Sequence, residues 1–256
     1  MAEKSMLLDL TKCMACRGCQ VACKQWNELP AEKTKFFSGP GYQNPKDLSS
    51  NTWTLVKFVE KQMVNGEIKW LFRKHQCMHC TDAACVKNCP VNAAIRTDEG
   101  FVVFNQKECI GCGTCVSVCP FNVPHLDGGI GEGKSKKCFG CMDRVSNGLE
   151  PACAKACPTG AIRFGDRKEL LSLAHKVQRE KKVRIYGEKE LDGLHMIYLL
   201  PLGDPELYDL PSNPVAPVEE GSLWLKELFK SFSKVGLPTA LVGLAIAYFK
   251  NRDNEA

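Results

Sequence analysis

Aromatic residues are scarce in this chain: Phe, Trp and Tyr make up only 8% of the 256 residues, and no long basic run is interleaved with them. The formal net charge of +5 therefore does not indicate a nucleic-acid surface, which needs clustered Lys and Arg beside stacking rings. The first residues hold no apolar secretory segment. No acid–base pair and no nucleophile with a neighbouring base stands out, so we expect no catalytic site on this chain.

No cysteine is left over from a regular arrangement. The chain has 16 cysteines, and they fall into four groups of four, which we call the first to fourth quartets. The quartets are Cys13, Cys16, Cys19 and Cys23; Cys77, Cys80, Cys85 and Cys89; Cys109, Cys112, Cys115 and Cys119; and Cys138, Cys141, Cys153 and Cys157.

Disulfides, zinc and iron–sulfur clusters are the three chemistries that use so many thiols. Disulfides suit small secreted domains, and a thiol at every third position crowds partners that disulfide geometry would keep apart. Zinc sites use C-x2-C pairs separated by a longer loop, a pattern that only the fourth quartet fits. The run CIGCGTCVSVCP matches C-x2-C-x2-C-x3-C-P, the ferredoxin pattern for a [4Fe–4S] cluster. We expect iron–sulfur clusters, with zinc as the alternative for the fourth quartet.

The spacing also predicts how a quartet is used. A tight loop can wrap three thiolates around one face of a cluster, while the fourth cysteine lies on the following helix and points away. In two-cluster ferredoxins that fourth cysteine ligates the other cluster. Gly18, Gly111 and Gly113 would let the backbone follow a cluster closely and direct its amides to the sulfides.

Three side chains near the quartets have an ambiguous role. Pro follows the last cysteine of three quartets, but Cys23 is followed by Lys24 in a segment that can continue as a helix. Lys24 is either solvated, or a charge beside an anionic cluster or a partner subunit. His75 and His79 flank Cys77; because four cysteines are already present, we expect supporting or structural roles for them.

We expect an α+β fold of tandem ferredoxin-like [4Fe–4S] modules with short strands and helices. Residues 1–165 form the four-cluster domain, which begins with the apolar strand MLLDL and contains an insertion loop at 28–52. The segment WTLVKFVEKQMVNGEIKWLFRKHQC predicts a hairpin around Asn65-Gly66. GFVVFNQKEC and AIRFG predict strands, and the similar segments CPVNAAI and CPTGAI indicate an internal repeat.

The rest of the chain is expected to complete this domain and to continue as a linker and an anchor helix. Residues 166–202 hold a helix at 167–182 and the strands VRIYG and HMIYLLPL, and residues 203–221 are an extended, proline-rich linker. Residues 222–256 form a C-terminal anchor helix and a short tail. Its uncharged run at 235–249 covers about 22 Å as a helix, against a hydrocarbon core of about 30 Å. The residues alone leave a membrane span and a buried helix both open.

Several longer segments resemble one protein family. They are CRGCQVACKQWN, YQNPKDLSSNTWTLVKF, KWLFRKHQCMHC, CIGCGTCVSVCPFNVP, DRVSNGLEPACAKACPTGAI and GDPELYDLPSNP. In these segments the chain resembles the iron–sulfur β subunit of respiratory, membrane-bound formate dehydrogenases of the nitrate-inducible type. The quartets are common to the electron-transfer subunits of molybdenum and tungsten oxidoreductases, whereas the loop at 42–53 and PELYDLP are more particular to the formate branch.

The resemblance implies a non-catalytic electron relay. A catalytic α subunit with a molybdenum or tungsten bis-pterin centre would oxidise formate, and this chain would pass the electrons through four [4Fe–4S] clusters to a cytochrome b γ subunit and quinone. The first and fourth quartets would share one cluster pair, and the second and third another. The implied ligands are Cys13, Cys16, Cys19 and Cys157 for cluster 1; Cys77, Cys80, Cys85 and Cys119 for cluster 2; Cys109, Cys112, Cys115 and Cys89 for cluster 3; and Cys138, Cys141, Cys153 and Cys23 for cluster 4.

The same resemblance implies a location at the bacterial inner membrane. The C-terminal helix would anchor the chain in a single pass, with the cluster domain on the periplasmic face; the cytoplasmic face is the alternative, because the flanking charges do not decide. Two other functions stay open. One is an electron-transfer subunit of a nitrate, polysulfide or dimethyl sulfoxide reductase, and the other is a free-standing polyferredoxin.

Overall fold

The framework of the molecule is a four-stranded sheet. The computed structural model describes residues 2–34 and 42–217. The sheet has the order β8 (Ile162–Asp166), β1 (Lys4–Asp9), β10 (Met196–Leu200) and β9 (Arg184–Tyr186). β1 runs parallel to β10 and antiparallel to β8, and β9 is antiparallel to β10. The strand closest to the N-terminus thus pairs with two strands from the far end of the described chain.

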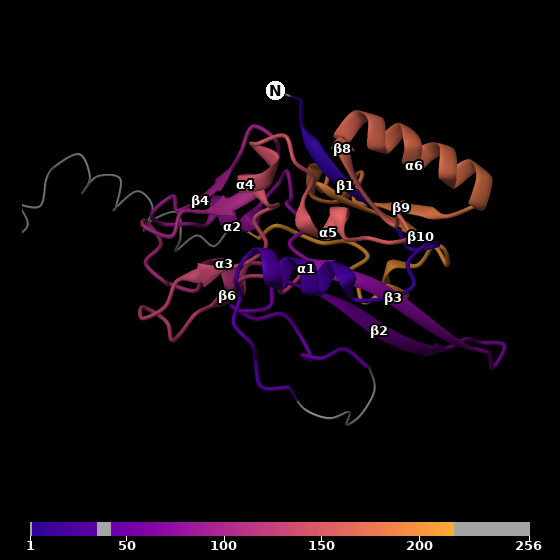
Figure 1. Cartoon of the computed structure of the whole chain (residues 1–256), viewed down its shortest axis with the longest axis horizontal. Helices are drawn as coiled ribbons and strands as arrows, with labels where there is room; N and C mark the ends of the chain where they lie inside the picture. Colours follow the sequence, from indigo (N-terminus) through magenta and orange to yellow (C-terminus); the bar gives the residue numbers. More distant parts are fainter. Residues whose placement is uncertain (1, 35–41, 218–256) are drawn as a thin grey trace, which may run out of the picture.

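The two central strands of the sheet are covered on both faces. Leu7, Ile197 and Leu199 pack against α6 (Arg167–Lys181), which lies along one face of the sheet (Figure 1). Met6 and Tyr198 point to the opposite face and join a larger core that also contains buried cysteines. Alternate side chains of a strand point to opposite faces, and a strand covered on both faces is apolar throughout. This explains why MLLDL and MIYLL carry almost no polar residues.

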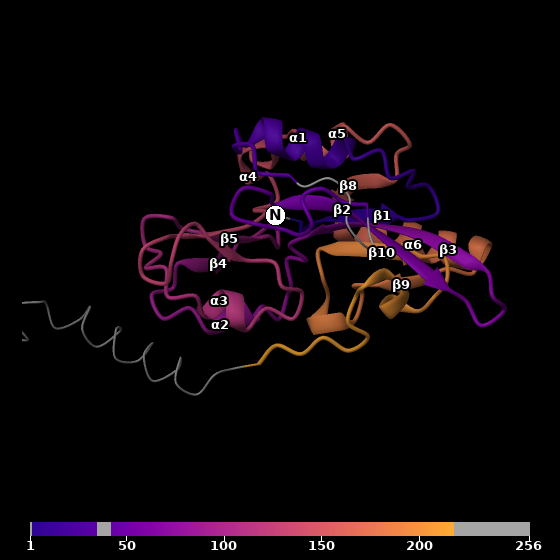
Figure 2. The same cartoon turned by 90° about the horizontal axis from the view of Figure 1, so that it is seen from below.

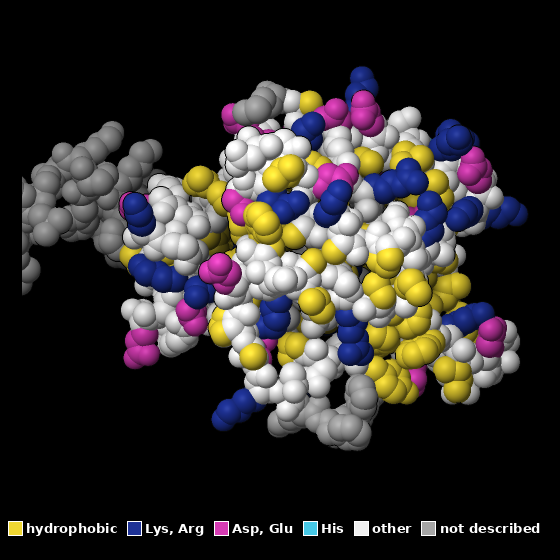
Figure 3. Space-filling model, in the orientation of Figure 1, with side chains coloured by type: hydrophobic (Ala, Val, Ile, Leu, Met, Phe, Trp, Pro, Cys, Tyr) yellow, Lys and Arg dark blue, Asp and Glu magenta, His cyan; other side chains and the backbone are white. Residues whose placement is uncertain are grey.

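A long hairpin extends away from the sheet. β2 (Thr54–Gln62) and β3 (Ile68–Gln76) pair antiparallel along their whole lengths, as the sequence predicts. Gly66 closes the turn with a φ of 82°, a conformation that glycine adopts without strain, and its N–H donates to Met63 O at 2.8 Å. Figures 2 and 3 show the hairpin projecting to one side, with hydrophobic side chains gathered over it.

Short helices lie within the quartets and pack in pairs. α1 (Gly18–Trp26) packs against α5 (Ala152–Lys155), and α2 (Ala84–Lys87) packs against α3 (Thr114–Ser117). Figure 2 shows the α1–α5 pair in a different layer from α2 and α3. The pairing brings together quartets that are distant in sequence.

The remaining elements are short. β4 (Ala94–Arg96) pairs with β5 (Val102–Phe104), which confirms a strand between the second and third quartets. β6 (His125–Leu126) pairs with β7 (Ser135–Lys136), and both are too short to predict from a pattern. Two further short helices are α4 (Met142–Val145) and the 3₁₀ helix η1 (Glu190–Asp192).

The prediction of an extended linker is wrong for one segment. Pro205–Tyr208 form a second 3₁₀ helix, η2. Asp204 caps this turn, because its Oδ1 accepts a hydrogen bond from Glu206 N at 3.0 Å. Tyr208 is buried and its hydroxyl oxygen accepts a hydrogen bond from Leu202 N at 3.3 Å, so the linker is folded onto the domain here.

The predicted C-terminal anchor at 222–256 lies outside the described residues. Across residues 2–34 and 42–217, no helix has both the length and the apolar character that crossing a membrane requires.

Candidate iron–sulfur cluster sites

The first quartet and the last cysteine of the fourth line one cavity, which we call site 1. Its thiols belong to Cys13, Cys16, Cys19 and Cys157. The loop between β1 and α1 curls around the cavity, because Ala15 and Arg17 both adopt left-handed backbone angles with φ of 55° and 62°. The cavity is thus built by three neighbouring thiols and one thiol from the end of α5.

The second and third quartets exchange a cysteine in the same way. Site 2 is lined by Cys77, Cys80, Cys85 and Cys119, and site 3 by Cys89, Cys109, Cys112 and Cys115. Each site combines three thiols of one quartet with the last thiol of the other. This exchange follows from the packing of α2 against α3, because each helix precedes the last cysteine of its quartet by two residues.

Site 4 is the set Cys23, Cys138, Cys141 and Cys153. Cys23 is buried on α1, which packs against α5, the helix that carries Cys153. Burial, and next the negative charge at Cys138, raise the pKa of the Cys23 thiol well above its ordinary value; Cys153 and Cys141 act in the same direction. The first and fourth quartets therefore also meet by exchanging one cysteine.

The four sites form a row. Thiols of adjacent sites act on each other electrostatically in the pairs Cys19–Cys153, Cys138–Cys77 and Cys85–Cys115. The order is therefore site 1, site 4, site 2 and site 3. Cys16 in site 1 and Cys112 in site 3 are the two exposed cysteines of the chain, so the row reaches the surface at both ends.

The chemistry of these sites fits [4Fe–4S] clusters. Each site offers the four thiols that a cluster takes as ligands. Burial raises the pKa of Cys115 to about 11 and that of Cys141 to about 12, so these thiolates need a bound cation, which cluster iron supplies. Gly111, with φ of 69°, has no room for a side chain, because a Cβ there would collide with Gly133 O. The loop can therefore hold its backbone against the cavity only with glycine at this position.

Comparisons with known proteins point to the same chemistry. A family model described as a 4Fe-4S dicluster domain matches residues 68–167, and a second model with the same description matches residues 12–93. The nitrate-inducible formate dehydrogenase iron-sulfur subunit of Escherichia coli K12 is 41% identical, over 96% of this chain and 85% of that protein. The chain belongs to the iron–sulfur subunits of formate dehydrogenases.

Other relatives agree with this assignment. The formate dehydrogenase-O iron-sulfur subunit of the same E. coli strain is 39% identical over 96% of this chain and 80% of that protein. The formate dehydrogenase 2 subunit beta (cytochrome c-553) of Nitratidesulfovibrio vulgaris is 38% identical over 77% of this chain and 93% of that protein. The family resemblance that the motifs predict is confirmed, and this formate dehydrogenase subunit is an electron-transfer protein with [4Fe–4S] clusters. The model matching 68–167 covers the whole fourth quartet, which favours a cluster over zinc there.

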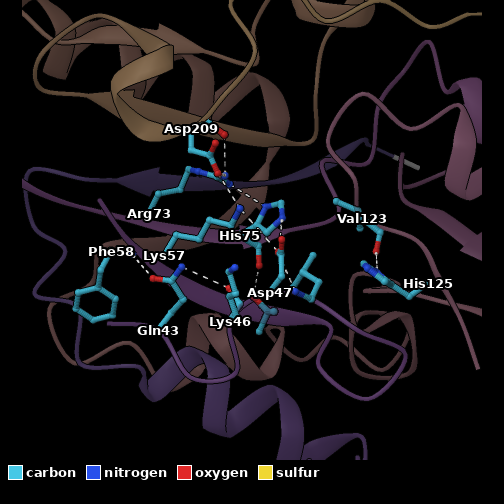
Figure 4. Close-up of polar contacts among 12 residues, drawn as sticks. Gln43, Lys46, Asp47, Lys57, Phe58, Arg73, His75, Val123, His125 and Asp209 are labelled. Atoms are coloured by element: carbon cyan, nitrogen blue, oxygen red, sulfur yellow. Dashed lines mark hydrogen bonds and ion pairs between the residues drawn. The ribbon is translucent and has the colours of Figure 1, made fainter. Parts of the chain in front are cut away.

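The two histidines that flank Cys77, His75 and His79, contact groups other than thiols. His75 Nδ1 accepts a hydrogen bond from Arg73 Nη1 at 2.9 Å, and its Nε2 lies 3.8 Å from Asp47 Oδ1 (Figure 4). His79 Nδ1 accepts a hydrogen bond from Val102 N at 2.9 Å. Burial lowers the pKa of both rings well below the ordinary value, so both are neutral. These contacts agree with the structural roles that we expect for them.

The Lys24 side chain is 26% exposed and contacts a loop rather than a cluster site. Its Nζ donates to Pro30 O at 2.6 Å and to Asn51 O at 2.9 Å. Both carbonyl groups belong to the loop predicted at 28–52. Lys24 therefore ties this loop to α1.

Two buried lysines are functional candidates that sequence reasoning misses. Lys74 is 3% exposed and lines site 1, and Lys137 is 5% exposed and lines site 2. For Lys74, the sequence feature that could have revealed it is the polar run RKHQ at the end of the predicted strand, directly before Cys77. Charged residues at the buried end of a strand need an anionic or polar partner.

Proposed function

We propose that this subunit holds four [4Fe–4S] clusters and has no catalytic site, and that it carries electrons from a formate-oxidising α subunit to a cytochrome b γ subunit and quinone. The α subunit would hold the molybdenum or tungsten bis-pterin centre. The observation that carries the proposal is the row of four sites with four thiols each, exposed only at its two ends. Such a row supports transfer across the protein from one partner to another.

The proposed ligands are the sixteen cysteines in four sets, supported by the cavities that they line and by the contacts between the short helices. Cluster 1 takes Cys13, Cys16, Cys19 and Cys157; cluster 2 takes Cys77, Cys80, Cys85 and Cys119; cluster 3 takes Cys109, Cys112, Cys115 and Cys89; and cluster 4 takes Cys138, Cys141, Cys153 and Cys23. Zinc in the fourth quartet would leave the row without its second site. A complete row therefore favours four clusters.

In this function the residues of the chain hold the clusters, exclude water from them and expose the two end sites to partners. When bound, each cluster supplies a centre that accepts and releases one electron. The thiols hold the four centres in a row, and apolar walls such as Phe121 and Val123 at site 2 keep water away from them. The exposed edges at Cys16 and Cys112 place the two end sites where a partner can approach. We assign the site 1 end to the α subunit and the site 3 end to the cytochrome, following the family resemblance.

The function is tested by purifying the complex in mild detergent and identifying its subunits. We expect a molybdenum or tungsten subunit and a cytochrome b to accompany this chain, and formate to reduce an artificial dye in the same sample. Nitrate, polysulfide or dimethyl sulfoxide reduction without formate oxidation would assign the chain to another oxidoreductase. An intact chain that purifies alone without detergent would assign it to the free polyferredoxins.

We also propose that residues 222–256 anchor the subunit at the inner membrane, with the cluster domain on the periplasmic face. The support is the uncharged run at 235–249, with Lys234 and Lys250 placed to reach the two interfaces. Deleting residues 231–256 should release a complex that reduces dye with formate but no longer reduces quinone. Deleting only residues 251–256 is the control and should leave quinone reduction intact. Retention of the longer deletion in the membrane would contradict the anchor, and protease access only from the cytoplasm would contradict the orientation.

A further inference from the structure

Lys74 occupies an unusual position for a lysine. It lies on β3 and is 3% exposed, and its side chain lines site 1. Its neighbours Arg73 and His75 point to the other face of the strand, where they contact Asp209 and Asp47 (Figure 4). Strand alternation therefore directs the Lys74 ammonium toward the cysteines.

The groups around Lys74 are cysteine thiols rather than carboxylates. Among the residues that the structure describes, no carboxylate oxygen lies within 4.0 Å of its ammonium. Burial disfavours the charged form of Lys74, whereas negative charge at Cys153, Cys19 and Cys138 favours it, and the pKa is raised. Cys19 belongs to site 1, whereas Cys153 and Cys138 belong to site 4. One ammonium thus acts on both sites.

The other buried lysine has a different environment. Lys137 Nζ donates to Cys138 O at 2.9 Å and to Val102 O, and lies 4.7 Å from the centre of the Phe104 ring. Its charge is partly compensated by carbonyl groups and an aromatic face. Among the described residues, no carbonyl group or carboxylate compensates the Lys74 ammonium in this way, so its charge acts mainly on the thiol sites.

We propose that Lys74 is a fixed positive charge shared by clusters 1 and 4, and that it raises the reduction potentials of both. This rests on the proposed cluster ligands. A reduced cluster carries one more negative charge than an oxidised one, and a buried cation stabilises that charge strongly because the surroundings screen it weakly. When one electron passes from cluster 1 to cluster 4, the first is oxidised and the second is reduced. A positive charge close to both clusters stabilises the reduced state of each. Neither cluster then becomes an energetic barrier to electron transfer between them.

The experiment is a redox titration with dithionite, monitored by electron paramagnetic resonance, on the purified complex. The neutral variants are K74M and K74Q, and K74R keeps the charge. K69M is the matched control, because Lys69 lies on the same strand but is partly exposed and paired with Glu67. We expect K74M and K74Q to keep their iron and to shift the oxidised-to-reduced ratio of two clusters at least tenfold, which is about 59 mV for a one-electron couple. K74R and K69M should titrate like the unaltered protein.

Because dithionite rather than formate reduces the clusters, the titration tests this inference independently of the proposed function. Neutral variants with full iron and unchanged potentials would overturn the proposal. A shift in only one cluster would overturn the claim that the charge is shared. If both neutral variants lost iron while K74R kept it, the charge would serve cluster assembly, and the proposal about potentials would be wrong.

Discussion

Cys23 differs from the other last cysteines because its helix continues through it. α1 extends to Trp26, three residues beyond Cys23, and Asn27 Nδ2 donates to Cys23 O at 2.8 Å. The helices before Cys89, Cys119 and Cys157 each end two residues earlier. A residue that precedes proline is disfavoured in a helical conformation, which explains the difference. Lys24 in place of proline therefore lets Cys23 sit inside a helix that also holds the loop at 28–52.

The exchange of cysteines gives a prediction for Cys23. The variant C23A should lose about four iron ions per chain and the same paramagnetic signal that C153A loses, because both cysteines line site 4. C19A should lose a different signal, that of site 1. Iron analysis and electron paramagnetic resonance on the three variants make the comparison. If C23A and C19A removed the same signal, each contiguous quartet would bind its own cluster and the exchange would be wrong.

His195 predicts a pH dependence of stability. Its ring is fully buried, Nδ1 donates to Lys4 O at 2.6 Å, and Nε2 accepts from Arg96 Nη2 at 3.0 Å, so the folded ring is neutral. Burial is the main cause that lowers its pKa; Arg96 and Arg167 also lower it, against the opposing effects of Lys4 O and Glu3. As the pH falls below about 6.5, the unfolded chain binds a proton that the folded chain does not. The free energy of unfolding should then fall by up to about 1.4 kcal/mol per pH unit until the folded ring is protonated.

The matched variant for this prediction is H195Q, which can keep a donor and an acceptor but does not titrate. Its apparent midpoint of thermal unfolding should fall less than that of the unaltered protein between about pH 7 and about pH 5.5. Identical pH dependence in the two proteins would show that His195 does not contribute.

Among the elements, the two loops at site 3 depend on glycine. Gly111 and Gly131 both have positive φ, and Gly131 N donates to Gly111 O at 3.0 Å, so the two loops hold each other. A Cβ at Gly111 would meet Gly133 O, whereas a Cβ at Gly131 would meet nothing within 4 Å. G131A should cost only the strain of a left-handed residue, about 1–2 kcal/mol. G111A should cost more, and should also lower the iron content of site 3. Thermal unfolding and iron analysis check this, and equal effects of the two variants would contradict it.

Elements with local patterns could be predicted from the sequence, and elements that depend on distant pairing could not. The hairpin follows from two β-rich runs around Asn65-Gly66, and α6 from a long helical pattern. The parallel pairing of β1 with β10 joins opposite ends of the described chain, and no local pattern specifies it. η2 forms because Tyr208 is buried by the surrounding fold, a contact that composition cannot predict.

The candidate sites could also be predicted only in part from local sequence patterns. Spacing alone predicts the sixteen cysteines as ligands and groups three thiols of each site, because these are close in sequence; it leaves zinc open for the fourth quartet. The choice of partner quartet came from the family resemblance, since it depends on how the short helices pack. Lys74 could not be found from cysteine spacing, because its position beside site 1 depends on how β3 packs in the folded chain.

At the scale of the whole molecule, the four sites extend from one surface to another. Site 1 and site 3 contain the exposed thiols Cys16 and Cys112, and sites 4 and 2 lie between them. The sheet, with α6 on its far face, supports the half that holds sites 1 and 4. This arrangement suits a subunit that joins two partners rather than one that acts on a small substrate.

The most direct test of this account is to add formate to the purified, anaerobic complex and follow its iron–sulfur signals. We expect about sixteen iron ions per chain, beyond those of any partner subunit, no stoichiometric zinc, and reduction of the clusters of this chain by formate. About twelve iron ions with one zinc would contradict the complete row of four clusters. Cluster signals that appear with dithionite but not with formate would contradict the relay itself.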